Sequence, residues 1–368
     1  MGSSNRDVGG YRGRRTVTDV LKMIAIVLVV LVVLAVAGVV YLQRYMVYTD
    51  EGVKLELPPF LQMLRGEKEP AASVPEPGDL SIDIQPAGSV SQPQEPDPVQ
   101  KEPAGFALTL PVSAVADGSA AGRLAEAGAD MLILEMKDQE GQLAWLSGRA
   151  EASRSKVNGT QEITDALRRW NAGDVYTIAR VCCFRDNTAP YYHNPLALRS
   201  GNGNWKDELG LRWLSPSDEK AQAYIAGLCG ELAELGFDEI VLEHYAFPVQ
   251  GKLDRISKGR PAGAEERTAR VTAFLTQVQQ AAAPYGTKIS LRVERDTLTG
   301  GESSSGITAP LVEQYAGRVW MAEDGLLPAP LDLLEQAGIT GGTGRLVAIT
   351  PARTEGSQVV QAVLLPAQ

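Results

Sequence analysis

The chain has 368 residues, of which 44% are hydrophobic, and a formal net charge of −10. This charge argues against a nucleic-acid-binding protein, because such proteins need a basic face to displace the counterions of the phosphate backbone. The three cysteines and two histidines include no CxxC or HExxH spacing. We therefore predict no metal site and no cofactor, and expect the cysteines to be buried thiols without a disulfide framework.

The amino-terminal part of the chain predicts a membrane anchor. Residues 1–22 are polar and basic, and the apolar run Met23–Leu42 that follows is long enough to cross a hydrocarbon core of roughly 30 Å. By the positive-inside rule, the basic excess keeps the amino terminus in the cytoplasm and places the rest outside. A cleaved signal peptide is the competing interpretation, since Ala35-Val36-Ala37 resembles a cleavage site, but apolar residues continue beyond it. We therefore expect a single-pass signal-anchor protein held in a lipid bilayer by residues 23–42.

Residues 43–104 are interpreted as an extracytoplasmic stalk. Val53–Leu57 alternates like a short strand, whereas Arg65–Pro103 is rich in Pro, Glu, Gln, Ser and Gly. The second stretch has too few large apolar residues to offset the entropy lost on ordering, which predicts a disordered linker.

Strand patterns alternate with helix patterns over residues 105–368. Such alternation over about 250 residues predicts an α/β fold, a (β/α)8 barrel of the TIM type. The weak point is the last crossover, residues 351–358, which is too short for a helix. We therefore expect an irregular last strand or an incompletely closed barrel. The predicted strands are Phe106–Val115, Asp130–Asp138, Val175–Phe184, Glu239–Tyr245, Lys288–Glu294, Arg318–Glu323, Gly344–Thr350 and Val359–Leu365. The predicted helices cover residues 119–129, 163–171, 218–235, 264–283, 309–316 and 331–337.

The carboxyl ends of the strands should form the ligand site, with inward side chains alternating along each strand. We set the alternation by requiring apolar residues, such as Leu132, Leu134 and Met136, to face the helices. His244 then points outward or onto the rim and is expected to be structural. The inward positions near the mouth are Glu135, Lys137, Arg180, Glu243, Arg292, Glu294 and, at the end of the sixth strand, Glu323.

Two interpretations of this charged cluster remain open. Glu243 and Glu294, at the tips of neighbouring strands, could be the paired carboxylates of a carbohydrate hydrolase, with aromatic residues of the loop 185–216 stacking on sugar rings. Alternatively, the Glu, Lys and Arg side chains neutralise one another as a salt-bridge network. Arg292 would then hold the pKa of both carboxylates down, which does not suit a general acid.

Three segments carry a resemblance to a known family: LILEMKDQEG, YTIARVCCFRD with the downstream NWKDELGLRWLSP, and FDEIVLEHYAFP. They resemble bacterial (β/α)8-barrel domains of envelope proteins that are assigned as glycoside hydrolases and are largely of unknown function. The resemblance covers about Gly105 to Ile349 and implies a barrel hydrolase acting on an envelope or extracellular polysaccharide. It implies substrate contacts for most residues that match the family pattern: Lys137, Arg180, Asp186, Trp205, Asp207 and Tyr245. Asp138 also matches the pattern, but we expect it to cap the turn before Gly141 rather than to contact substrate.

The sequence also departs from the family pattern. The family usually has Asp at position 243, Arg at 246 and Asp at 292, where this chain has Glu243, Ala246 and Arg292. This indicates a divergent member. Three hypotheses stay open: a membrane-anchored hydrolase that uses Glu243 and Glu294, an inactive barrel that binds glycan or a protein partner, and a scaffold that only spaces an envelope complex.

Overall fold

The computed structural model describes residues 46–49, 52–55, 101–103, 105–299 and 304–364. The chain divides into two units, Met1–Val90 and Ser91–Gln368, which are described separately. In the first unit, β1 (Met46–Thr49) and β2 (Gly52–Leu55) pair as an antiparallel hairpin. The predicted membrane segment 23–42 and most of the predicted stalk lie outside the described residues. Among the residues that are described, no helix is both long and apolar enough to span a bilayer.

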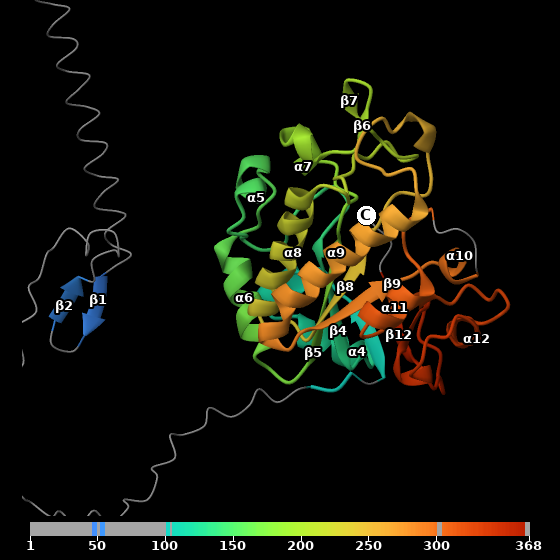
Figure 1. Ribbon diagram of the computed structural model, residues 1–368. Coiled ribbons are helices and arrows are strands. Elements are labelled where there is room, and N and C mark those ends of the chain that lie inside the picture. Colours follow the sequence, from blue (N-terminus) through green and yellow to red (C-terminus); the bar gives the residue numbers. More distant parts are fainter. Residues whose placement is uncertain (1–45, 50–51, 56–100, 104, 300–303, 365–368) are drawn as a thin grey trace, which may run out of the picture. The chain divides into compact units, whose positions relative to one another are not determined.

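Eight parallel strands close into a barrel in the second unit (Figure 1). All eight predicted strands are present, each shorter than its sequence pattern. The expectation of incomplete closure is wrong, because β12 pairs with both β11 and β3 although only a loop connects it to β11. The loop between Ile349 and Val360 contains no helix, yet it is long enough to bring β12 into parallel register beside β11. In spatial order the strands are β10 (Val319–Ala322), β11 (Leu346–Ile349), β12 (Val360–Val363), β3 (Phe106–Thr109), β4 (Met131–Lys137), β5 (Tyr176–Cys182), β8 (Glu239–Glu243) and β9 (Lys288–Arg292).

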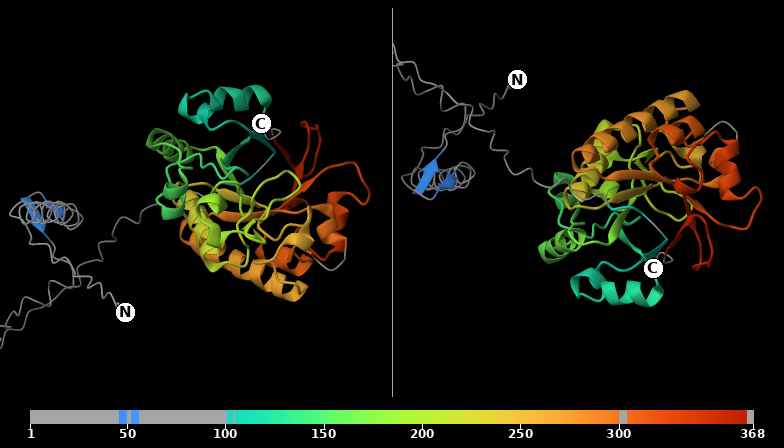
Figure 2. Two further views of the ribbon diagram at one scale, coloured as in Figure 1. Left: turned by 90° about the horizontal axis from the view of Figure 1, so that it is seen from above. Right: turned by 90° about the horizontal axis from the view of Figure 1, so that it is seen from below.

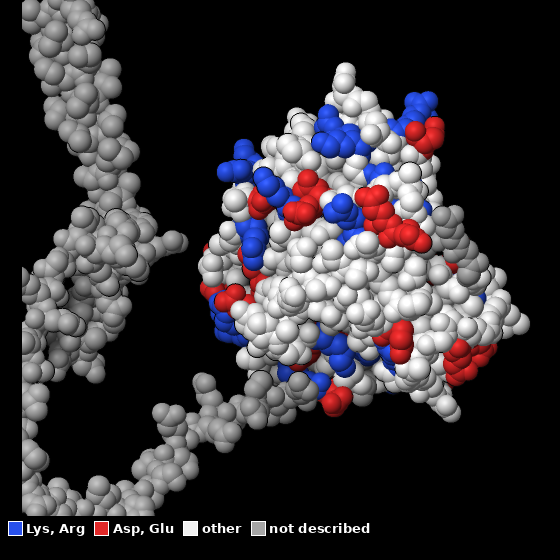
Figure 3. All heavy atoms as spheres, viewed as in Figure 1, with Lys and Arg blue, Asp and Glu red and all other residues white. Residues whose placement is uncertain are grey.

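Helices lie around the outside of the strands (Figure 2). The six predicted helices correspond to α4, α6, α8, α9, α11 and α12. Asp218 is the N-cap of α8 (Glu219–Glu234), because its carboxylate accepts hydrogen bonds from the amides of Lys220 and Ala221. A band of uncharged side chains covers the face around α9 (Figure 3). The helices are α3 (Ser113–Ala116), α4 (Ala120–Ala127), α5 (Ala150–Ser155), α6 (Gln161–Asn171), α7 (Ala189–Tyr192), α8 (Glu219–Glu234), α9 (Ala264–Ala282), α10 (Arg295–Leu298), α11 (Ala309–Tyr315) and α12 (Pro330–Gln336).

The apolar side chains form two cores on opposite faces of the barrel wall. Leu132, Leu134 and Met136 of β4 pack outward against the helices, whereas Met131 and Ile133 belong to the inner cluster. The predicted alternation is therefore confirmed for the apolar residues of β4. All three cysteines are buried and unpaired, as predicted.

A buried ion pair lies inside the barrel near the amino-terminal ends of the strands. The Glu239 carboxylate pairs with Arg318 and accepts from the Tyr176 hydroxyl at 3.0 Å and from Trp320 Nε1 at 2.9 Å. Both charged side chains are almost fully removed from solvent. One arginine and two aromatic donors bind this carboxylate, so a closed polar group of side chains lies beside the apolar inner cluster at this end of the barrel.

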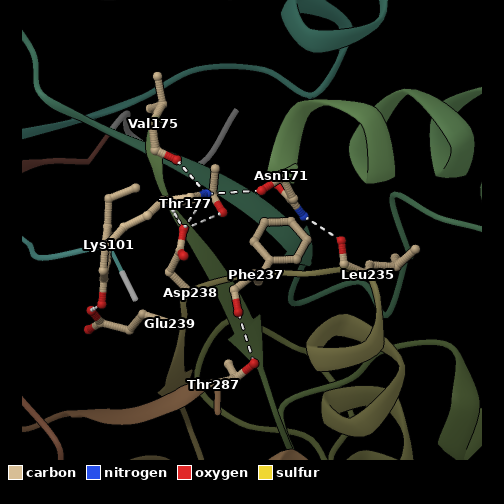
Figure 4. A network of polar contacts seen from close by, with 10 residues as sticks. Lys101, Asn171, Val175, Thr177, Leu235, Phe237, Asp238, Glu239 and Thr287 are labelled. Atoms are coloured by element: carbon tan, nitrogen blue, oxygen red, sulfur yellow. Dashed lines mark hydrogen bonds and ion pairs between the residues drawn. The ribbon is translucent and has the colours of Figure 1, made fainter. Parts of the chain in front are cut away.

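The chain joins the barrel at this same end of the strands (Figure 4). Lys101 Nζ donates to the carbonyl oxygens of Asn171 and Val175, at 2.9 and 3.1 Å, and lies 3.2 Å from the Asp238 carboxylate. Asp238 in turn accepts from the Thr177 amide at 2.7 Å. Val175 and Asp238 directly precede β5 and β8, so the entering chain is fixed at the face opposite the carboxyl-terminal mouth.

Replacing Arg318 with Met should destabilise the fold. The change leaves the Glu239 carboxylate buried without its cation, which typically costs about 3–5 kcal/mol. The free energy of unfolding, measured by urea denaturation, tests this expectation. The matched control is Arg270→Met on the surface of α9, where the ion pair with Glu266 is solvated and should contribute less than about 1 kcal/mol. Equal effects of the two substitutions would contradict the prediction.

Candidate functional site

A cavity of about 750 Å³ opens at the carboxyl ends of β8 and β9. Its wall comes from residues 243–250 after β8, from Arg292 to Thr297 after β9, and from the segment 304–307. Arg185, Glu208 and Trp213 of the long loop after β5 complete the described part of the wall. This volume is typical of small-ligand and sugar sites, and it lies where a barrel of this kind places its site.

Glu243 is the central charged group of this cavity. Its side chain is 9% exposed and accepts from Arg180 Nε and Nη2 at 3.1 and 3.0 Å, and from Arg292 Nη1 at 3.2 Å. Burial by itself would raise the pKa of Glu243, but Arg180 and then Arg292 outweigh it and hold the pKa below its ordinary value. The carboxylate is therefore ionised at neutral pH. Its position in the cavity is the inward one that the alternation of β8 predicted.

Glu294 lies on the rim, with 71% of its side chain exposed. It stands 3.5 Å from Arg292 Nε, while Glu243 contacts Nη1 of the same guanidinium. The two predicted carboxylates therefore flank one planar group and lie within about 10 Å of each other, which both glycosidase geometries require. The structure brings the predicted pair together, with Arg292 between its members.

Glu135 approaches Glu243 from the other side. Its carboxylate lies 3.8 Å from Arg180 Nη2, and that nitrogen lies 3.0 Å from Glu243 Oε2, so the two carboxylates are at most about 7 Å apart. The side chain is 44% exposed. Partial burial raises the pKa of Glu135 and outweighs the opposing effect of Arg180, while Asp138 and Glu243 raise it further. Glu135, whose pKa is raised, and Glu243, whose pKa is lowered, therefore both contact Arg180.

Lys137 corrects the predicted alternation. The β4–β5 register shifts between Glu135 and Lys137, and this irregularity takes the lysine out of the mouth. Its ammonium lies 2.9 Å from Asp186 and donates to the Cys182 carbonyl at 2.8 Å, with both charged side chains 0% exposed. Gly141 packs against this pair, since a Cβ there would lie 2.3 Å from Asp186 Oδ1. Lys137 and Asp186, expected to contact substrate, thus form a buried structural pair.

Trp205 and Asp207 also fold the long loop. Trp205 is buried and donates from Nε1 to the Lys252 carbonyl at 2.9 Å. Asp207 accepts from Arg185 at 2.7 Å and from Trp213 Nε1 at 2.9 Å, and its side chain is almost fully buried. These contacts hold the loop together and neither residue lines the cavity, so substrate contact by Trp205 and Asp207 stays a prediction.

The remaining two predicted contacts differ in position. Tyr245 borders the cavity, but its side chain is buried, so it offers the ligand little surface. Glu323 lies exposed beyond the end of β10 and does not line the cavity. The hydroxyl of one and the carboxylate of the other therefore do not join the charged cluster around Glu243.

His244 lies on the rim of the site, which is one of the two placements that the alternation of β8 allowed. β8 ends at Glu243, and His244 adopts a left-handed backbone with φ 48°, which breaks the alternation and places the residue on the cavity wall. Its ring packs edge-on against Trp213, with the ring centroids 5.6 Å apart. Desolvation and the nearby Arg185 lower the pKa of His244 to about 4, so the imidazole is neutral at pH 7.

Sequence reasoning missed three charged residues that line the cavity: Arg185, Glu208 and Asp296. Arg185 and Glu208 occupy a loop, and Asp296 lies in the four-residue helix α10, so no period predicts the direction of their side chains. Arg185 follows a strand and was the most accessible to prediction, because charged residues at strand ends gather at barrel mouths. Among the described residues, no group of three or more His, Cys, Asp or Glu side chains is placed to hold a metal ion.

Comparison with known proteins confirms the resemblance over part of the barrel. Residues 123–302 match the profile of a family described as "Putative glycosyl hydrolase domain". This range is narrower than the one inferred from the sequence, but it includes Glu135, Arg180, Glu243, Arg292 and Glu294. No curated protein matches the chain.

Several solved structures are similar to this chain. A hypothetical protein from Ruminiclostridium thermocellum is 22% identical, with a TM-score of 0.43, over 50% of this chain and 96% of that one. An exo-β-N-acetylglucosaminidase from Vibrio harveyi is 12% identical, with a TM-score of 0.44, over 68% of this chain and 41% of that one. The glycoside hydrolase domain of PelA from Pseudomonas aeruginosa is 15% identical, with a TM-score of 0.38, over 67% and 83%.

Glu243→Gln should destabilise the protein in a pH-dependent way. Because the folded-state pKa of Glu243 is lowered, its ionised form contributes stability above the unfolded pKa of about 4.3, and this contribution is lost as the pH falls through the lower folded value. We expect a deficit of about 3 kcal/mol at pH 7 that narrows below pH 4. Urea unfolding across this range measures it, with the exposed Glu126→Gln on α4 as control. A deficit independent of pH would refute the ion-pair account.

Proposed function

We propose that the barrel hydrolyses a polysaccharide outside the membrane, with Glu243 as the ionised carboxylate of a catalytic pair. The observation that carries this proposal is the position of Glu243 on the cavity wall, where two arginines keep it charged and two further carboxyl groups lie on either side. Glycoside hydrolysis needs one ionised carboxylate as nucleophile or base and a second carboxyl group that delivers a proton.

The surrounding residues suit this chemistry. Arg180 and Arg292 reach Glu243 from the strands on either side and fix its orientation. The second carboxyl group is Glu294, as the sequence predicted, or Glu135, and both lie within the distance that paired carboxylates need. The partly exposed Arg292 and the rim residue Glu294 are available to sugar hydroxyl groups, and the buried loop contacts of Trp205 and Asp207 hold the wall in place.

An extracytoplasmic, membrane-anchored location fits this activity. Residues 23–42 supply the apolar run of the anchor, and the stalk separates it from the barrel. The attachment of Lys101 to the amino-terminal face of the barrel leaves the mouth at the opposite end. An envelope polysaccharide is therefore the substrate class that we propose.

One observation favours a second function, in which the barrel binds glycan or a protein partner without cleaving anything. Both carboxylate oxygens of Glu243 are already bound by arginines, and position 246 carries Ala where the family usually has Arg. A carboxylate so firmly paired is a poorer nucleophile. Binding without turnover would be its expected behaviour.

Assay of the full-length protein against a panel of envelope and extracellular polysaccharides separates the two functions. We expect release of new reducing ends from at least one polymer, and a loss of at least about 10³-fold in Glu243→Gln, because the pair can no longer act. Glu126→Gln should behave like the wild type. Retained polymer binding without release of reducing ends by the wild type would instead establish the non-catalytic function.

The anchor predicts where the protein resides. We expect the full chain to remain with membranes after washing at high salt and high pH, and a chain lacking residues 23–42 to be released. A reporter that is active only outside the cytoplasm should be active when it is fused to the carboxyl terminus. A cytoplasmic reporter signal, or release of the full chain by washing, would refute the proposed topology.

A further inference from the structure

We propose that Glu135 on β4 is the proton donor to the departing sugar oxygen, with Glu243 as its partner. This assignment rests on the proposed hydrolysis and replaces Glu294, the residue that sequence alternation favoured. The structural reason is the position of Arg180, whose side chain lies between Glu135 and Glu243 and contacts the two unequally.

The geometry places Glu135 at working distance from Glu243. The separation of at most about 7 Å through Arg180 Nη2 is compatible with direct attack by Glu243 and with a water held between the two groups. Arg180 forms two hydrogen bonds to Glu243, at 3.1 and 3.0 Å, but stays 3.8 Å from Glu135. The guanidinium is therefore committed to Glu243, and Glu135 remains free to take up a proton.

The charged surroundings of Glu135 favour its protonated form. Burial raises the pKa of the carboxyl group, and the negative charges of Asp138, just beyond the end of β4, and of Glu243 on β8 act in the same direction. Only Arg180 on β5 opposes them. Glu135 does not itself line the cavity, but 44% of its side chain is exposed and it contacts Arg180, which binds the cavity residue Glu243.

Glu294 is a weaker candidate for the same role. Its side chain is 71% exposed and stands 3.5 Å from Arg292 Nε. Two different nitrogens of the Arg292 guanidinium separate Glu294 from Glu243, whereas Glu135 and Glu243 both contact the same nitrogen of Arg180. Its rim position instead suits hydrogen bonding to a sugar hydroxyl.

Hydrolysis by this pair breaks one bond and forms one bond at the anomeric carbon. The bond from the anomeric carbon to the glycosidic oxygen breaks, and the proton of Glu135 passes to that oxygen. The new bond to the anomeric carbon comes from Glu243 directly, followed by water, or from a water molecule that gives its proton to Glu243. In the first course Glu135 regains its proton from the attacking water. In the second, Glu243 releases its proton to solvent and Glu135 takes one up from solvent, and either course consumes one water for each bond cleaved.

The test compares full-length wild type with Glu135→Gln, Glu135→Asp and Glu294→Gln on phenyl and 2,4-dinitrophenyl glycosides of both anomers. A dinitrophenolate leaves without protonation, whereas a phenolate needs an acid. We expect Glu135→Gln to lower kcat/KM about 10²–10⁴-fold on the phenyl glycoside but less than about 10-fold on the dinitrophenyl glycoside. The wild-type rate should fall at alkaline pH as the acid loses its proton, and this fall should be absent in Glu135→Gln. Glu135→Asp should keep that fall at a reduced rate, which excludes a merely structural effect.

The outcomes are distinguishable. Glu294→Gln should lower kcat/KM for both substrates to the same extent, because it removes a contact to the sugar and leaves the acid in place. Leaving-group dependence that appears in Glu294→Gln and not in Glu135→Gln would overturn the assignment while leaving the proposed hydrolysis intact. A wild type that cleaves neither glycosides nor polymers would refute the hydrolysis itself, and the assignment with it.

Discussion

Glu243 joins three strands of the barrel through charge. Arg180 on β5 and Arg292 on β9 reach it from either side, so the carboxyl ends of β5, β8 and β9 are held together by one carboxylate. These ion pairs fix the charge state of Glu243, the spacing of Glu135 and Glu294 from it, and the floor of the cavity. The electrostatic character of the mouth depends on this arrangement, because each of the flanking carboxyl groups meets Glu243 only across an arginine.

The two ends of the barrel use similar residues for different purposes. At the amino-terminal end, Arg318 and Glu239 are sealed inside with aromatic donors, and no solvent reaches them. At the mouth, Arg292 and Glu135 remain partly exposed, so their charges can interact with a ligand. Burial therefore distinguishes the two networks. A buried pair that also binds aromatic donors contributes to a unique structure, whereas a partly open pair can exchange partners.

The long loop after β5 depends on buried charges that resemble site residues in the sequence. Lys137 with Asp186, and Asp207 with Arg185 and Trp213, pair strong hydrogen-bonding groups so that the loop can lie over the barrel. Buried ion-pair residues such as these can match a family pattern just as catalytic residues do. Their match alone therefore does not distinguish contact with substrate from support of the wall.

The sequence by itself determined the barrel. Periods of two and 3.6 residues located its eight strands and its six longer helices, because burial on one or both faces of an element leaves a repeating pattern. It also located Glu135, Arg180, Glu243 and Arg292 at the mouth, since alternation holds as long as a strand stays regular.

Only the tertiary structure decided what happens where regularity ends. The register shift before Lys137, the left-handed backbone of His244 and the loop residues that line the cavity follow from long-range packing, which leaves no local period. The contacts of Arg180 with two carboxyl groups on different strands, and thus the opposite pKa shifts of Glu135 and Glu243, likewise depend on distances across the barrel. Alternation gives the face of a strand on which a side chain lies, but the energy of a charge depends on its distance from the other charges.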